Sequence, residues 1–218
     1  MLRKLMLSLV GVLAPIASAY AAEPWSGLYV GAQVGYAWGD SVQTFNSAGT
    51  VGSTGRFDIN GWVGGGTLGY NWYSQRWVFG IEGDYSGSGI KGSTGSSGSY
   101  GCGTGCSTEL TSFGTLRGRL GYTWNNVLLY GTGGWAFADI KSTLNGGTAN
   151  NWQNGWAVGA GAEYLLTRNW SMKVEWDYLN FGSFQWTNVT DTHFSCAGIN
   201  CSTDAKVNLV RFGVNYHF

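Results

Sequence analysis

The chain has 218 residues, among them 37 Gly, 12 Trp, 12 Tyr and 10 Phe, and its 12 acidic and 12 basic side chains cancel to a formal net charge of zero. Charged residues make up 11% of the chain, well below the roughly 25% of soluble globular domains, whereas the apolar content of 44% is ordinary. This composition excludes a disordered chain and argues against a cytosolic enzyme, and zero net charge gives no electrostatic basis for binding nucleic acid.

The first residues predict a secretory signal peptide. Arg3 and Lys4 precede an apolar stretch at 5–14, and small residues dominate 17–22. We expect cleavage after Ala21, so that 1–21 is the signal and 22–218 is a single domain that works outside the cytoplasm. An uncleaved membrane anchor is the alternative, but the apolar stretch is shorter than the ~20 residues that a spanning helix needs.

After the signal, the sequence alternates between apolar residues and polar or small ones, which is the period of a β-strand. In the first segment Leu28, Val30 and Ala32 share one parity, while Tyr29 and Gly31 share the other. Eight such segments follow one another, at 28–38, 62–72, 77–85, 110–124, 127–137, 156–166, 170–178 and 210–218.

The connections between these segments are alternately long and short. Short links are expected at 73–75, 125–126 and 167–169, and long links rich in Gly, Ser, Thr and Asn at 40–56, 86–109, 140–151 and 182–204. An even number of antiparallel strands with this pattern is typical of outer-membrane barrels. The sequence therefore predicts an all-β fold, an eight-stranded antiparallel transmembrane up-and-down barrel with short periplasmic turns, long extracellular loops and both termini in the periplasm.

Charged residues within the predicted strands fall on the parity opposite to the apolar one. Because a Lys or Arg facing the bilayer midplane costs roughly 2–4 kcal/mol, we expect the apolar parity to face lipid and the charged parity to face the lumen. Trp, Tyr and Phe gather at both ends of the outward parity, as two girdles at the membrane interfaces do. The expected lumen charges are Glu82, Asp84, Arg117, Arg119, Glu163, Lys173, Glu175, Asp177 and Arg211.

Five blocks of sequence resemble the strands of a known family. They are Trp25–Gly35, Gly69–Tyr85, Thr115–Phe137, Gly159–Gly182 and Val210–Phe218. Through them the chain resembles the small porin-like outer-membrane β-barrel family of alphaproteobacteria, whose relatives include opacity-type and heme-binding surface proteins. The resemblance implies a fold and an outer-membrane location more firmly than an activity. The four cysteines depart from the family's pattern.

The last strand resembles the sorting signal of outer-membrane proteins, which the barrel-assembly machinery reads by strand addition. The residues of this assembly signal share one face and are Val210, Phe212, Val214, Tyr216 and Phe218. An ordinary edge strand is the alternative interpretation, although an unpaired apolar edge would be an aggregation hazard.

Eight strands enclose an interior that side chains can fill, whereas aqueous channels need many more strands. The five acids and four bases expected at mid-barrel height are nearly neutral together, and their burial requires pairing. The sequence therefore favours a polar plug. A narrow, gated ion path lined by the same residues is the alternative.

The four cysteines form two local pairs in predicted extracellular loops. Because periplasmic passage oxidises thiols, we expect the disulfides Cys102–Cys106 and Cys196–Cys201, with a four-cysteine zinc site as the alternative. No bound metal or other cofactor is expected.

Neither histidine makes a convincing catalyst. His193 lies in the run Asp191-Thr-His-Phe-Ser195, yet catalytic triads are recognised by geometry and not by adjacency, so no enzyme is predicted. As a heme ligand, His193 is suggested only by the heme-binding relatives. His217 is expected to form hydrogen bonds in the lumen near the periplasmic end.

Two classes of function remain. The first is a structural barrel that contacts outer-membrane lipid and displays its loops; the second is a narrow channel, or a heme or adhesion receptor acting through the loops. Loop aromatics are the expected contact points for an extracellular ligand. They are Trp152, Phe184, Trp186 and Phe194.

Overall fold

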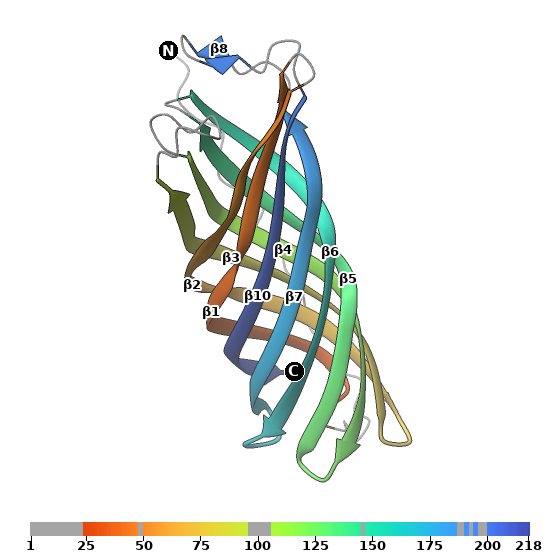
Figure 1. The fold of residues 1–218 in the computed structure, drawn as a ribbon. Coiled ribbons are helices and arrows are strands. Elements are labelled where there is room, and N and C mark those ends of the chain that lie inside the picture. Colours follow the sequence, from red (N-terminus) through yellow and green to blue (C-terminus); the bar gives the residue numbers. More distant parts are fainter. Residues whose placement is uncertain are drawn as a thin grey trace, which may run out of the picture.

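In a computed structural model of the protein, residues 24–47, 50–95, 106–144, 147–186, 190–191, 194–195 and 200–218 are described. They form a closed barrel of long, tilted strands (Figure 1). The barrel strands are β1 (Gly27–Ser47), β2 (Thr50–Ser74), β3 (Trp77–Thr94), β4 (Cys106–Trp124), β5 (Val127–Leu144), β6 (Gly147–Leu165), β7 (Trp170–Trp186) and β10 (Asn200–His217).

Every barrel strand pairs antiparallel with its neighbours, in the order β1-β10-β7-β6-β5-β4-β3-β2, and β1 also pairs with β2. The predicted eight-stranded up-and-down barrel is therefore confirmed. β8 (Thr190–Asp191) and β9 (Phe194–Ser195) form a separate two-stranded sheet. Within the described ranges, no helix has the length and apolarity needed to cross a membrane.

Three short turns join strands at one end of the barrel, which we call the turn end; the opposite end is the loop end. The turns are Gln75–Arg76, Asn125–Asn126 and 166–169, close to the predicted positions. Gln75, Arg76 and Asn125 have positive φ angles of 49°, 77° and 53°. This left-handed backbone suits two-residue hairpin turns, because it matches the twist of the flanking strands.

The strands extend further toward the loop end than the sequence predicted, so the predicted extents of the long links were wrong. β1 and β2 stay paired as far as Ser47 and Thr50, and β5 and β6 as far as Leu144 and Gly147. The prediction failed because the polarity of the two faces inverts there.

Beyond the membrane girdle, apolar side chains turn inward and charged ones outward. Ile59 and Ile90 are buried, whereas Arg56, Asp58 and Lys91 are exposed. An extramembrane β-barrel needs an apolar interior and a polar exterior, the reverse of the lipid-embedded part. A pattern search that followed outward apolar residues therefore lost the strands where the environment changes from lipid to water.

In the part of the barrel nearer the turn end, large apolar side chains point outward and pack in pairs across neighbouring strands. At the loop-end interface, the ring centroids of Tyr36 and Trp62 lie 5.4 Å apart. At the turn-end interface, Trp77 and Tyr122 lie 5.3 Å apart. These two rows of rings correspond to the aromatic girdles of a membrane-spanning barrel.

Glycines on the two faces of the wall have different surroundings, which gives a test of the side-chain orientation. A Cβ on inward Gly121 would lie 2.7 Å from the carbonyl oxygen of Leu129, whereas one on outward Gly118 would meet nothing closer than 3.8 Å. We expect Gly121→Ala to lower the free energy of unfolding by about 1–3 kcal/mol, and Gly118→Ala to leave it nearly unchanged. Urea unfolding in lipid vesicles measures both; equal effects would contradict the assigned faces.

Candidate functional site

All nine charged residues predicted for the lumen are buried inside the barrel, and none exposes more than 6% of its surface. We call this set the lumen belt. Strand register places several oppositely charged residues directly opposite one another: Glu82 with Arg117, Arg211 with Glu175, and Glu163 with Lys173. Opposite charges in such cross-strand positions attract each other, and the first two of these pairs are ion pairs, whereas Lys173 contacts Glu82 and Glu163 pairs with Arg119.

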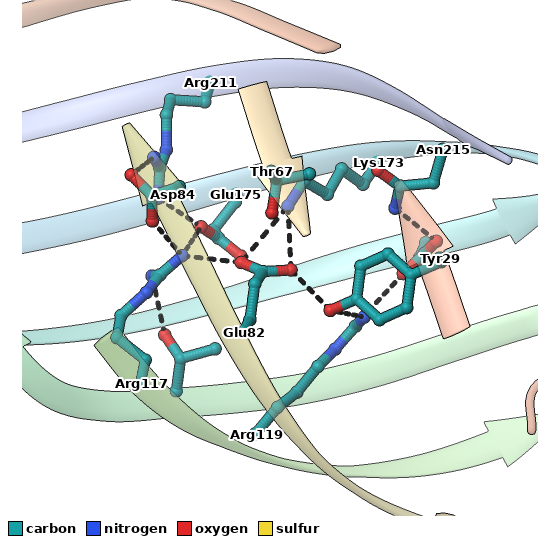
Figure 2. Close-up of polar contacts among 12 residues, drawn as sticks. Tyr29, Thr67, Glu82, Asp84, Arg117, Arg119, Lys173, Glu175, Arg211 and Asn215 are labelled. Atoms are coloured by element: carbon teal, nitrogen blue, oxygen red, sulfur yellow. Dashed lines mark hydrogen bonds and ion pairs between the residues drawn. The ribbon is translucent and has the colours of Figure 1, made fainter. Parts of the chain in front are cut away.

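Arg117 on β4 is the centre of the lumen belt (Figure 2). Its Nη2 lies 2.8 Å from Glu82 Oε1, 2.8 Å from Glu175 Oε1 and 3.3 Å from Asp84 Oδ2. Its Nη1 lies 2.5 Å from Asp177 Oδ1. One guanidinium therefore joins carboxylates from β3 and β7, strands that are not neighbours in the wall.

Arg211 on β10 contacts three of the same acids. Its Nη1 lies 2.9 Å from Asp84 Oδ1, and its Nη2 lies 2.6 Å from Glu175 Oε1 and 2.7 Å from Asp177 Oδ2. Arg117 and Arg211 thus share their carboxylates from opposite sides. Such sharing gives each buried charge several partners, which buried ions need to offset the loss of hydration.

A second group lies nearer the turn end, around Glu163. This carboxylate pairs with Arg119 and accepts hydrogen bonds from Ser171 Oγ at 2.5 Å and Asn215 Nδ2 at 2.7 Å. His217 Nε2 lies 3.3 Å from Glu163 Oε1 and 3.0 Å from Ser171 Oγ, so this predicted lumen residue has polar partners.

Two tyrosines fill the space between the charged groups. The Tyr29 hydroxyl donates to Glu82 Oε2 at 2.7 Å, and the Tyr130 hydroxyl donates to Glu175 Oε2 at 2.8 Å. The Arg119 guanidinium lies 3.7 Å from the centroid of the Tyr130 ring, within cation–π range.

Sequence analysis did not include Tyr29 or Tyr130 among the lumen residues, although both lie on the parity that was predicted to face the lumen. A Cβ on Gly69 would lie 2.3 Å from the Tyr29 ring, and one on Gly161 would lie 2.6 Å from the Tyr130 ring. Each ring therefore occupies room left by a glycine on the neighbouring strand, a pairing that only the strand register reveals.

Apolar layers lie on both sides of the lumen belt. Along β7 the successive inward residues are Lys173, Glu175, Asp177, Leu179 and Phe181, so the lumen changes from charged to apolar toward the loop end. The turn-side cluster consists of Trp25, Val78, Leu128, Tyr130 and Leu165. The loop-side cluster consists of Ala37, Phe57, Ile59, Val63, Ile90, Cys106, Leu110, Phe113, Ala136, Ala138, Ile140, Ala157, Leu179, Phe181, Ala205, Val207 and Leu209.

The remaining predicted sites lie partly outside the described residues. Cys106 is buried and disulfide-bonded, but Cys102 and Cys196 are not described, so both pairings stay predictions. His193, the suggested heme ligand, is not described either. Across the described ranges, no group of three His, Cys, Asp or Glu side chains is placed to hold a metal ion.

Of the four loop aromatics, Trp152 is exposed on β6, whereas Phe184, Trp186 and Phe194 lie on β7 and β9 without described side chains. Whether these residues form a common surface therefore stays a prediction.

Comparison with known proteins gives consistent matches. A family model described as the outer membrane protein beta-barrel domain matches residues 6–218. The chain is 36% identical to a 31 kDa outer-membrane immunogenic protein of Brucella melitensis, over 94% of this chain and 88% of that protein. It is 31% identical to a 25 kDa outer-membrane immunogenic protein of Brucella abortus, over 89% and 79%.

Among solved structures, the chain is similar to the outer membrane protein OprG from Pseudomonas aeruginosa. The TM-score is 0.53 at 14% sequence identity, and the match covers 88% of this chain and 97% of that one. At this level of identity, the similarity shows a shared fold alone.

The lumen belt predicts unequal effects of two arginine substitutions. Arg117→Ala removes an ion-pair partner from four buried carboxylates, and we expect it to lower the free energy of unfolding by about 3–5 kcal/mol. Arg56→Ala removes a side chain that is 70% exposed and pairs with Asp40 at 3.5 Å, so we expect about 0–1 kcal/mol. Urea unfolding of refolded protein measures both values.

If Arg117→Ala does not refold, Lys173→Met supplies the comparison. Lys173 contacts Glu82, which keeps Arg117 and Tyr29 as partners, so we expect a loss between those of the two arginine variants. Three equal losses would contradict a network centred on Arg117.

The cysteines give a prediction of connectivity. Peptide mapping by mass spectrometry without reductant should find Cys102 linked to Cys106 and Cys196 linked to Cys201, because each pair is close in sequence and crosses an oxidising compartment. Cross-linked peptides joining the two pairs, free thiols or bound zinc would each show that the pairing is wrong.

Proposed function

The chain belongs to the outer membrane protein β-barrel family, and from this membership we propose that it is a structural barrel with a closed lumen that displays its loop end at the cell surface. The curated relatives named above are outer-membrane proteins, in agreement with the location expected from the sequence. The outward apolar wall and its aromatic girdles suit direct contact with outer-membrane lipid.

The layering of the lumen carries the proposal. An ion moving along the axis would have to pass both the lumen belt, whose charges are already paired, and the loop-side cluster of apolar side chains. Hydrophobic constrictions exclude ions by dewetting, and removing an ion from water in an apolar layer is costly. The apolar layer therefore supports closure independently of the ion pairs.

The proposed orientation follows from the two described ends of the chain. Phe218 N donates to Leu28 O at 3.0 Å, and the ring centroids of Trp25 and His217 lie 6.1 Å apart. The first and last described residues therefore both lie at the turn end of the barrel. In outer-membrane barrels, short turns face the periplasm. We therefore place the turn end in the periplasm and the extended loop end outside.

Display of the loop end is supported by its construction and by its relatives. The strands continue beyond the girdle with a polar exterior, so the loop end of the barrel extends above the proposed membrane surface. The Brucella relatives are named as immunogenic, a property suited to exposed segments.

We also propose that the protein has no enzymatic activity. Ser171, His217 and Glu163 lie within hydrogen-bonding distance of one another, but each is at most 2% exposed. A nucleophile sealed in the lumen has no access to substrate, and the run at 191–195 is only partly described.

The last strand is proposed to carry the assembly signal. Residues 210, 212, 214 and 216 share the outward face of β10 and Phe218 follows the strand; Phe212 and Phe218 are exposed by 62% and 65%. β10 closes the barrel by pairing with β1, so its correct positioning is required for closure. Recognition of this strand by the barrel-assembly machinery, like the signal peptide at 1–21, remains part of the proposal.

Conductance in a planar bilayer tests closure. We expect refolded wild-type protein with intact disulfides to insert without ohmic current steps. Replacing Leu110 and Ile140 by serine hydrates the loop-side cluster and should produce a leak, whereas serine at exposed Lys206 should not.

Reproducible current steps from the wild-type barrel would overturn the closed lumen and favour the narrow channel. Such a channel should then change its ion selectivity when Glu82 is neutralised to glutamine. A wild-type barrel that inserts without current would support the closed lumen. Binding of heme or adhesion ligands by the loops, the alternative from sequence analysis, would then be tested next.

A further inference from the structure

The lipid-facing wall is not uniformly bulky. A groove of about 960 Å³ crosses the outward face of β3, β4, β5 and β6. Its floor consists of Gly118, Gly131, Gly133 and Ala160, and the rings of Trp77 and Tyr122 stand at its turn end. We call it the first groove.

The neighbouring atoms leave room for side chains at the glycine positions of this floor. A Cβ on Gly118, Gly131 or Gly133 would meet nothing closer than 3.8 Å, which is ordinary van der Waals contact. Inward glycines such as Gly35 differ, since a Cβ there would lie 2.3 Å from a backbone oxygen. The first groove is therefore an open space on the wall that larger apolar residues would fit and fill.

A second groove of about 660 Å³ lies on the outward face of β1, β10, β7 and β6. Its residues include Ala32 on β1, Phe212 on β10, Met172 on β7, and Ala162 and Tyr164 on β6. Tyr164 and Met172 are paired across the two strands that the 166–169 turn joins, so this groove also approaches the turn end.

An arginine lies in a turn next to strand residues that line each groove. Arg76 immediately precedes Trp77 at the edge of the first groove, and Arg168 lies in the turn below the second. Both arginines are exposed. The third turn, Asn125–Asn126, is uncharged, and none of the three turns contains an acidic residue.

Hydrogen bonds hold both arginine turns in place. Arg76 has a φ of 77°, and its carbonyl accepts hydrogen bonds from Thr123 N at 2.8 Å and Thr123 Oγ1 at 3.1 Å. In the other turn, Asn169 Nδ2 donates to His217 O at 2.8 Å. The two turns are therefore anchored to neighbouring strands at the membrane interface.

We propose that each groove with its arginine binds one glycerophospholipid, with an acyl chain along the groove and the phosphate on Arg76 or Arg168. Guanidinium groups match phosphate oxygens with two parallel hydrogen bonds, and an apolar groove adds dispersion contacts to a chain. This inference rests on the membrane placement proposed above, and it names phospholipids of the turn-end leaflet as specific partners.

Native mass spectrometry of the full barrel in detergent tests the inference, with palmitoyl-oleoyl-phosphatidylglycerol as the probe. Wild-type protein should bind two molecules. Arg76→Gln and Arg168→Gln should each weaken one site by roughly fivefold, since a basic residue near an anionic lipid surface contributes this much to binding. Gly131→Leu should fill the first groove and remove one molecule while the barrel still folds.

Two controls distinguish binding through the headgroup at the two proposed sites from nonspecific adsorption of lipid. Diacylglycerol with the same chains lacks the phosphate and should bind the wild-type barrel no better than phosphatidylglycerol binds the double arginine variant. Lys91→Gln removes an exposed charge at the loop end and should change nothing. Wild-type binding by the double arginine variant, or an equal loss in Lys91→Gln, would overturn the proposal.

Insertion is measured first, by the different gel migration of boiled and unboiled protein. Loss of insertion in the wild type would overturn the proposed function together with the lipid sites. An inserted wild-type barrel that retains no phosphatidylglycerol would overturn the lipid sites alone.

Discussion

Pairing of buried charges inside a closed sheet is the constraint on which this molecule depends. Two arginines on non-adjacent strands, Arg117 and Arg211, share Asp84, Glu175 and Asp177. Removing either arginine would take a partner from these three buried carboxylates in a space without free access to water, and breaking such buried pairs costs more than the intact pairs contribute. The lumen belt therefore fixes the relative positions of strands that share no backbone hydrogen bonds.

The exterior of the barrel wall meets a different environment at each height. In the lipid-embedded part, the exterior must be apolar, so polar and charged groups are confined to the lumen. Above the girdle the exterior meets water, and the interior fills with residues such as Phe57 and Ile140. One continuous hydrogen-bonded ladder thus carries two opposite polarity patterns, and the apolar layer that results lies across the axis above the charges.

Glycine placement connects these features. Inward glycines make room for other groups: Gly69 and Gly161 lie against the rings of Tyr29 and Tyr130, which in turn bind Glu82 and Glu175. Outward glycines at the first groove have no such neighbour and leave the lipid-facing surface open. The same residue type therefore supports a packed interior on one side of the wall and a recessed exterior on the other.

The sequence by itself determined the strand count, the face of each strand, the three turns and the identity of the nine lumen charges, because period-2 alternation and the exclusion of charge from lipid are local properties. It did not determine how far the strands continue, since the outward apolar signal disappears where lipid gives way to water.

Only the tertiary structure decided which acid meets which base, and which tyrosines join them. Arg117 and Arg211 lie 94 positions apart in the sequence, and they share carboxylates only because closure of the barrel brings β4 and β10 to opposite sides of one narrow lumen. Such contacts depend on strand register and on closure, which are properties of the whole sheet and not of any segment of the chain.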